Sequence, residues 1–388
     1  MSPQSAMRNP PALQKLLEGD DPPSPEAIDA FIDDHTPFPI RDGNRATFVY
    51  RGEAKSVRWQ HWIFGLPTSQ EFHRVEGTDL WTLTVELRRA SRIEYKLLID
   101  YGDSAVLIMD PYNPLRAIDP FGANSVCTTE GYQRPVWTLP NPTTRQGRIE
   151  TFNLRSKAFR GTREVQVYLP ARYRETRRYP LLVMHDGSDY LRFSATQTVL
   201  DNLIHRLEIP PMIVALCDPY DRLREYAADP RHAKHVVEEL LPALTSRYPL
   251  EDRPQSRCLM GASFGGVASL STAWRYPGVF GKLFLQSGSF AFTDIGNHTR
   301  GPAFDPVVEF MNQFRSNPGT PAEQIYLSCG VYESLIYENR SLVPLLQEYG
   351  MSVKYEWARD GHNWENWRDR MRAGLSWLFP GPLWVIYE

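Results

Sequence analysis

Residues 257–274 read RCLMGASFGGVASLSTAW. The apolar start is typical of a short buried strand and the end is typical of a helix, so the pentapeptide GASFG at 261–265 is the turn between them. A G-x-S-x-G turn of this kind is so sharp that the residues two before and two after the serine must lack side chains. It lifts the hydroxyl clear of the strand and directs the helix N-terminus at it. We therefore expect Ser263 to be a catalytic nucleophile.

Two further residues complete a predicted Ser–acid–His triad. His362 follows the expected strand at 352–357, and Gly361 lets that loop turn inward. Glu333 follows an expected buried strand at 325–330, so the chain order is Ser, Glu, His, as in hydrolases with this turn. We expect His362 to act as the general base and Glu333 to orient it. The other carboxylates that stay open for the acid are Glu338, Asp360 and Asp305.

An oxyanion hole needs two donors placed in advance. We expect one to be the backbone N–H of Phe264, directly after the serine. The other should come from the loop at 185–190, HDGSDY, which follows the expected strand at 180–184. Gly187 permits a close backbone approach there, and the N–H of Ser188 is the candidate donor. An ordinary strand-end turn has the same sequence features.

The chain resembles the enterochelin (enterobactin) esterase-like proteins of the esterase D branch of the α/β-hydrolases. The resemblance covers about residues 145–380. It implies an α/β-hydrolase fold and an acyl-ester hydrolase with a Ser–Asp/Glu–His triad and no metal; relatives often carry Asp where Glu333 stands. The stretches that carry the resemblance are HDG at 185–187, VEELLP at 237–242, GASFGG at 261–266, QSGSF at 286–290 and GHNWENW at 361–367.

The N-terminal part has a different pattern. Between residues 43 and 135, alternating apolar runs are separated by turn residues, which is typical of an antiparallel sandwich. Enterochelin esterase-like proteins carry an immunoglobulin-like domain there, so the resemblance implies one here. Trp59, Trp62 and Trp81 could form an aromatic platform for a sugar, but packing in the core is the default for such residues.

The chain thus divides into three expected parts. We expect a helical leader at 1–40, an immunoglobulin-like β-sandwich at 41–138 and, after a proline-broken linker, an α/β-hydrolase domain at 145–388. Strands and helices alternate through the last part, which predicts the α/β class with a doubly wound, mainly parallel sheet.

Composition excludes some classes of partner. The formal net charge is −3, so we expect neither nucleic acid nor a membrane surface as partner. The first 27 residues lack a signal-peptide pattern, and no apolar run approaches membrane-spanning length. The four cysteines are scattered without a C-x-x-C pair, which is typical of reduced thiols and predicts a cytoplasmic protein. The oligomeric state stays open.

Other candidate contacts surround the expected active edge of the sheet. Arg222 or Arg224 could clamp an anionic substrate and Glu225 could pair with one of them; the alternative is a solvated loop braced by an ion pair. His232 and His235 lack the spacing of a zinc site, so we expect no metal or cofactor. Trp364 either lines the pocket or packs the following helix onto the sheet. The full set expected to contact substrate is Asp186, Gly187, Arg222, Arg224, Glu225, Tyr226 and Trp364.

These patterns predict a serine carboxylic-ester hydrolase that acts through an acyl-enzyme. By resemblance alone, the substrate is the trilactone or aryl ester of a ferric catecholate siderophore such as enterobactin. The first alternative is a feruloyl or acetyl esterase on carbohydrate esters, with the N-terminal domain contacting sugar. The second is a catalytically silent binding protein on the same fold.

Overall fold

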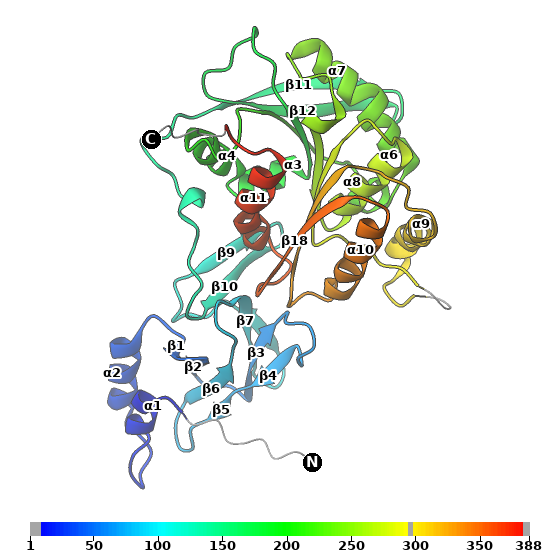
Figure 1. The fold of residues 1–388 in the computed structure, drawn as a ribbon. Coiled ribbons are helices and arrows are strands. Elements are labelled where there is room, and N and C mark those ends of the chain that lie inside the picture. The colour runs from blue at the N-terminus through cyan, green and yellow to red at the C-terminus, as the bar shows by residue number, and fades with distance from the viewer. Residues whose placement is uncertain (1–8, 294–297, 383–388) are drawn as a thin grey trace. The chain divides into compact units, whose positions relative to one another are not determined.

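The computed structural model describes residues 9–293 and 298–382 (Figure 1). Contacts within the chain divide it into two units. The N-terminal unit runs to Gln133 and also takes in two short distant segments, Val331–Glu333 and Arg359–Gly361. The C-terminal unit holds Arg134–Gly330, Ser334–Ala358 and the chain from His362 onward. None of the described helices is both long enough and apolar enough to cross a bilayer.

The N-terminal unit contains two antiparallel sheets after a pair of short helices. The aromatic core between the sheets joins Phe48 of one sheet to Trp59 and Tyr95 of the other, with ring centroids 5.2 and 5.0 Å away. Two sheets that share one core form a sandwich, and its classification as immunoglobulin-like stays a prediction. The helices are α1 (Pro11–Leu16) and α2 (Pro25–His35); one sheet has the order β1 (Ile40–Asp42), β2 (Arg45–Arg51), β6 (Leu80–Glu86), β5 (His73–Arg74); the other has the order β4 (Ser69–Glu71), β3 (Ser56–His61), β7 (Arg92–Asp100), β10 (Gly122–Thr128), β9 (Arg116–Asp119), with β8 (Ala105–Ile108) also paired to β7.

Burial separates the three tryptophans that were considered as a platform. Trp59 is fully buried and Trp81 is 5% exposed, and both belong to the sandwich core. Trp62 is 52% exposed. A platform of all three is therefore wrong, because the two core rings have no face left for a ligand.

The C-terminal unit is built on an eight-stranded sheet. Its first strand pairs are antiparallel, and β14, β13, β15, β16, β17 and β18 run parallel, which confirms the α/β class and the mainly parallel sheet. In order across the sheet, the strands are β11 (Arg148–Ser156), β12 (Gly161–Leu169), β14 (Ile213–Cys217), β13 (Leu181–His185), β15 (Arg257–Ala262), β16 (Lys282–Gln286), β17 (Gln324–Gly330) and β18 (Ser352–Ala358).

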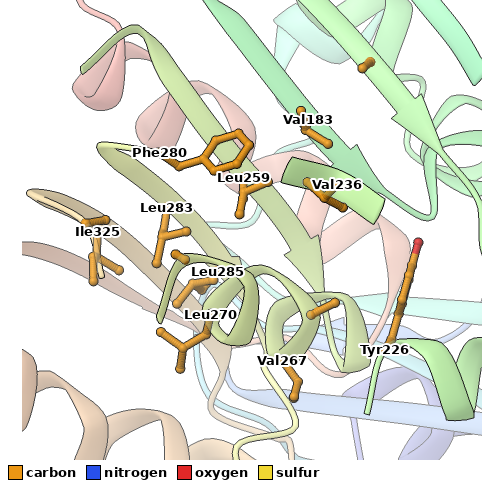
Figure 2. Close-up of a cluster of buried hydrophobic side chains, with 14 of the residues drawn as sticks. Val183, Tyr226, Val236, Leu259, Val267, Leu270, Phe280, Leu283, Leu285 and Ile325 are labelled. Carbon is orange, nitrogen blue, oxygen red and sulfur yellow. The ribbon is translucent and has the colours of Figure 1, made fainter. Parts of the chain in front are cut away.

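Helices cover both faces of this sheet (Figure 1). Successive residues of a strand point to opposite faces, so Leu182 and Val183 of β13 enter different cores. Figure 2 shows the core on the α8 face, where Val267 and Leu270 lie beside Leu283 and Leu285. The helices are α3 (Gly187–Phe193), α4 (Thr196–His205), α5 (Arg222–Glu225), α6 (Pro230–Lys234), α7 (Leu241–Arg247), α8 (Phe264–Arg275), α9 (Asp305–Ser316), α10 (Ile336–Glu348) and α11 (Trp364–Leu378), with a π-helical turn at His235–Leu240.

Candidate active site

Ser263 occupies a strained turn between β15 and α8. Its φ of 56° and ψ of −121° lie outside the regions that a residue with a side chain prefers. A Cβ on Gly261 would lie 2.2 Å from the carbonyl oxygen of Gly265, so only glycine fits at that position. The sharp turn expected from the sequence is therefore present. It places Ser263 at the N-terminus of α8, where the helix dipole favours negative charge.

The loop after β16 holds this turn in place. The N–H of Ser263 donates to the carbonyl of Gln286 at 2.9 Å, and the N–H of Ser289 donates to the carbonyl of Ser263 at 3.1 Å. The hydroxyls of Ser263 and Ser289 are also 3.1 Å apart. This loop belongs to the QSGSF stretch that contributes to the family resemblance, but we predicted no role for Ser289 from the sequence. The run of small polar residues directly after a buried strand could have indicated one.

The two expected oxyanion donors differ in their surroundings. Phe264 is the first residue of α8, and an N–H at that position has no acceptor within its own helix. The N–H of Ser188 instead donates to the carboxylate of Asp218 at 3.1 Å, and its hydroxyl bonds the same carboxylate. Ser188 is thus not the free donor that we expected, because a carboxylate already occupies its N–H.

Gly187 is required for packing. A Cβ at this position would lie 2.5 Å from the Cβ of Leu216 on β14. The close backbone approach expected at Gly187 therefore exists, but it is made to the neighbouring strand.

The candidates for the acid are held in different ways. Glu333 is buried and lies three residues beyond the end of β17. Glu338 bonds Arg300, while the carboxylate of Asp305 is 68% exposed and faces His298 at 2.8 Å. Asp360 accepts from Arg92 at 3.3 Å and from the N–H of Gly361 at 2.7 Å.

The loops that carry Glu333 and precede His362 meet each other. Strands β17 and β18 are parallel neighbours, with Gly330 opposite Ala358. Beyond their ends, the N–H of Tyr332 donates to the carbonyl of Asp360 at 3.2 Å. Tyr332 is the neighbour of Glu333, and Asp360 lies two residues before His362.

His362 lies immediately before a capped helix. Its side chain is exposed, and its ring centroid is 5.0 Å from that of Trp367 in a perpendicular contact. The next residue, Asn363, caps α11 by accepting from the N–H of Asn366 at 2.9 Å. The cap fixes where the helix begins and therefore where the histidine loop ends.

Arg222 is not an unengaged clamp for an anionic substrate. It donates to both carboxylate oxygens of Asp186, at 2.9 and 2.8 Å, and to the carbonyl of Ala262 at 3.3 Å. Asp186 is 3% exposed, so its charge is compensated inside the protein. The pair braces the residue directly before Ser263.

Glu225 could have paired with Arg222 or Arg224, but its ion-pair partner is Arg163. Arg163 of β12 binds Glu225 through two hydrogen bonds of 3.1 and 3.0 Å, and both side chains are buried. The hydroxyl of Tyr226 lies 3.3 Å from the carbonyl of Cys217, and its ring is fully buried. Glu225 and Tyr226 therefore stabilise the fold and leave no surface for a substrate, whereas Arg224 is exposed.

Trp364 packs inside the C-terminal unit. Its ring centroid lies 5.2 Å from that of Tyr190 and 4.8 Å from that of Trp367. The side chain belongs to the core on the α11 face. Of the two interpretations offered by the sequence, helix packing is the one that this burial supports.

A buried pair of imidazoles was missed. His185 and His232 face each other with their Nε2 atoms 2.9 Å apart. Burial lowers the pKa of His185 to about 4 and also lowers that of His232, so both are neutral at pH 7. His235 pairs instead with Glu239 at 2.7 Å. Over residues 9–293 and 298–382, no three His, Cys, Asp or Glu side chains come together as a metal site would require.

The Esterase family model, described as "Putative esterase", matches residues 156–378, which is more than half of the chain. The chain belongs to this esterase family. The esterase is 27% identical over 334 residues to the iron(III) enterobactin esterase of Escherichia coli O6:H1, with 79% of this chain and 81% of that protein covered.

Solved structures show the same fold. The ferric enterobactin esterase from Salmonella typhimurium has a TM-score of 0.72 at 22% identity, covering 88% of this chain and 95% of that one. A ferulic acid esterase from Anaeromyces mucronatus in complex with ferulic acid has a TM-score of 0.52 at 17% identity, covering 62% and 96%. The predicted resemblance to enterochelin esterase-like proteins is confirmed, and the chain is a carboxylic ester hydrolase.

Proposed function

We propose that this esterase cleaves its substrate through an acyl-enzyme formed on Ser263. The Oγ of Ser263 bonds to the ester carbonyl carbon while His362 accepts the hydroxyl proton. His362 then passes this proton to the departing alkoxide as the C–O bond breaks. Water then attacks the acyl-enzyme carbonyl while His362 accepts its proton, and His362 returns that proton to the Oγ of Ser263 as the acid is released. The strained backbone of Ser263 at the start of α8 is the observation that carries this proposal.

Glu333 is the proposed acid that orients His362. Its support is positional: it follows β17, and its neighbour Tyr332 is bonded to the loop that leads to His362. A buried carboxylate in this role would hold the imidazole tautomer and stabilise the imidazolium.

The oxyanion would lie at the start of α8. The N–H of Phe264 has no acceptor in its helix, and the positive end of the helix dipole favours negative charge there. The loop at 185–190 would supply a second N–H. Ser188 can do so only if Asp218 releases it, since its N–H is bonded to that carboxylate.

The proposed substrate is a small-molecule ester of a catecholate siderophore. The enterobactin esterases of Escherichia coli O6:H1 and Shigella flexneri cover 79% and 90% of this chain, more than the C-terminal unit alone contains, so their likeness extends into the N-terminal unit. The match to the enterobactin esterase of Dickeya dadantii covers 60%. The ferulic acid esterase covers 62%. Shared two-unit architecture therefore favours the siderophore ester over a feruloyl or acetyl ester of a carbohydrate. A cytoplasmic location stays a prediction from the sequence.

Parallel rate measurements test this function. The esterase should hydrolyse p-nitrophenyl acetate, and Ser263→Ala should abolish the reaction. Ser246→Ala, at an exposed position on α7, is the matched control and should keep full activity. Ferric enterobactin should then be cleaved with a higher kcat/KM than methyl ferulate; the reverse order would favour the carbohydrate-ester alternative. Full activity in Ser263→Ala would overturn the nucleophile itself.

A further inference from the structure

Two short segments, one that contains Glu333 and one that directly precedes His362, make their contacts within the N-terminal unit. These are Val331–Glu333, after β17, and Arg359–Gly361, after β18. Both strands belong to the hydrolase sheet, yet the chain beyond each one is held by residues more than 200 positions earlier in the sequence. Connecting loops usually run over the protein surface, so a buried long-range contact such as that between Arg92 and Asp360 needs a reason.

The first loop is held through Tyr332. Its hydroxyl is 2.6 Å from the Oγ of Ser91, and its carbonyl accepts from the N–H of Phe64 at 2.8 Å. The N–H of Tyr332 donates to Asp360 of the other loop. All three polar groups of Tyr332 are therefore engaged, and the next residue in the chain is Glu333.

The second loop is held through Arg92. The N–H of Arg92 donates to the carbonyl of Arg359 at 2.9 Å. Its guanidinium, 1% exposed, bonds Asp360 at 3.3 Å and Glu94 at 2.9 Å. Asp360 in turn accepts from the N–H of Gly361, the residue before His362. A buried pair of opposite charges with directed hydrogen bonds restricts its partners to one geometry more strictly than apolar packing does.

We propose that Ser91 and Arg92 are positioning residues for ester hydrolysis, holding the loops that carry Glu333 and lead to His362. The proposal rests on the triad proposed above. Neither residue needs to touch substrate, since Ser91 acts through the hydroxyl of Tyr332, and Arg92 acts through the carboxylate of Asp360 and the carbonyl of Arg359.

The expected effect is on turnover. Misplacing a catalytic group by about 1 Å costs up to about 100-fold in rate. Tyr332→Phe removes the hydroxyl–hydroxyl hydrogen bond and leaves the ring and the backbone bonds in place, so it should lower kcat about 3- to 10-fold. Ser91→Ala removes this bond together with the bond from Ser91 to the carbonyl of Arg88, so its loss should be at least as large. The KM should change less than about twofold, because ground-state binding is not altered. The double variant should lose no more than Ser91→Ala alone, because that substitution already removes the shared hydrogen bond.

Thr84→Val is the matched control. Thr84 of β6 and Thr47 of β2 form a hydroxyl–hydroxyl hydrogen bond of 2.9 Å in the same unit. This bond joins two strands of the sandwich and involves neither loop. Valine has the same shape without the hydroxyl. The kcat of Thr84→Val should equal that of the unsubstituted esterase. The melting temperatures of Thr84→Val, Tyr332→Phe and Ser91→Ala should agree within a few degrees. Arg92→Lys, which keeps the charge but loses the fork of donors, should lower kcat further.

A background without the acid separates positioning from general loosening of the fold. In Glu333→Gln, the orientation of the acid no longer matters, so Tyr332→Phe should cause no additional loss in the rate of fluorophosphonate labelling. A kcat of Tyr332→Phe equal to that of the unsubstituted esterase would overturn the proposal. So would an equal loss of labelling rate on adding Tyr332→Phe to the unsubstituted esterase and to Glu333→Gln. Loss of function in Ser263→Ala with unchanged kcat in Tyr332→Phe would refute only this inference, whereas full activity in Ser263→Ala would refute the proposed function.

Discussion

The guanidinium of Arg222 donates two hydrogen bonds to the carboxylate of Asp186 and a third to the carbonyl of Ala262. One ion pair therefore joins the loop after β13 to the residue that precedes Ser263. The chain contains an arginine close to the proposed nucleophile, but its charge is already compensated. An anionic substrate would have to be recognised by other groups.

Breaking this pair should destabilise the fold. Asp186→Asn leaves Arg222 without its charged partner; since the arginine side chain is 35% exposed, water screens part of the loss. The free energy of unfolding should fall by about 1–3 kcal/mol, below the value for a fully buried pair. Urea denaturation measures this. Arg231→Gln, which breaks the more exposed pair with Asp229, should cost less than about 1 kcal/mol. Equal losses would contradict the bracing role.

The tight turn can be tested at Gly261. A Cβ there would overlap the carbonyl of Gly265, so Gly261→Ala should cost more than about 3 kcal/mol and slow fluorophosphonate labelling of Ser263. Gly161 in β12 is the control, because the nearest atom to an added Cβ is 3.8 Å away. Gly161→Ala should change stability by less than about 1 kcal/mol. A label on a residue other than Ser263 would refute the nucleophile.

The acid can be identified by amide substitution. Glu333→Gln should lower kcat by about 100- to 10,000-fold, because an amide favours the wrong imidazole tautomer. Glu338→Gln disturbs the contact with Arg300 and should lower kcat less than about threefold. Steady-state kinetics with p-nitrophenyl acetate distinguish the two. If the large loss instead follows Glu338→Gln, the roles of the two carboxylates are exchanged.

Buried histidines should make the fold sensitive to mild acid. Burial lowers the pKa values of His61 and His185 to about 4, from the ordinary value of 6.5, and lowers that of His232. Below pH 6.5 the unfolded chain binds protons that the folded chain does not, so stability falls as the pH falls. Between pH 7 and pH 5 the free energy of unfolding should decrease by at least about 2 kcal/mol.

Urea denaturation at both pH values measures that decrease. His185→Gln should reduce it, because this substitution removes one of the histidines whose pKa burial lowers. Stability that is constant or rises between pH 7 and pH 5 would contradict the prediction.

Local patterns were sufficient for the elements that carry the site. The turn around Ser263 depends on residues within two positions of the serine, since only a missing Cβ allows Gly261 to approach Gly265. The alternation of strands and helices predicted a parallel sheet, because the hydrophobic period of each segment is a property of that segment alone. The places of Glu333 after β17 and His362 after β18 follow from the same reasoning.

Partners distant in sequence were not predictable in this way. Arg163 binds Glu225 because β12 lies beside β14 in the sheet, and strand order is a property of the whole chain. The bonds from Asp218 to Ser188 and from His232 to His185 likewise join separate loops and helices. Which charges meet depends on how the elements pack.

The sequence by itself determined the sharp serine turn, the α/β class and the family, because these depend on short-range sterics, periodicity and recognisable motifs. Only the tertiary structure decided which carboxylates are already paired and that residues next to Glu333 and His362 are bonded to Ser91 and Arg92. The physical reason is that a hydrogen bond forms wherever folding brings donor and acceptor within about 3 Å, however far apart they lie along the chain.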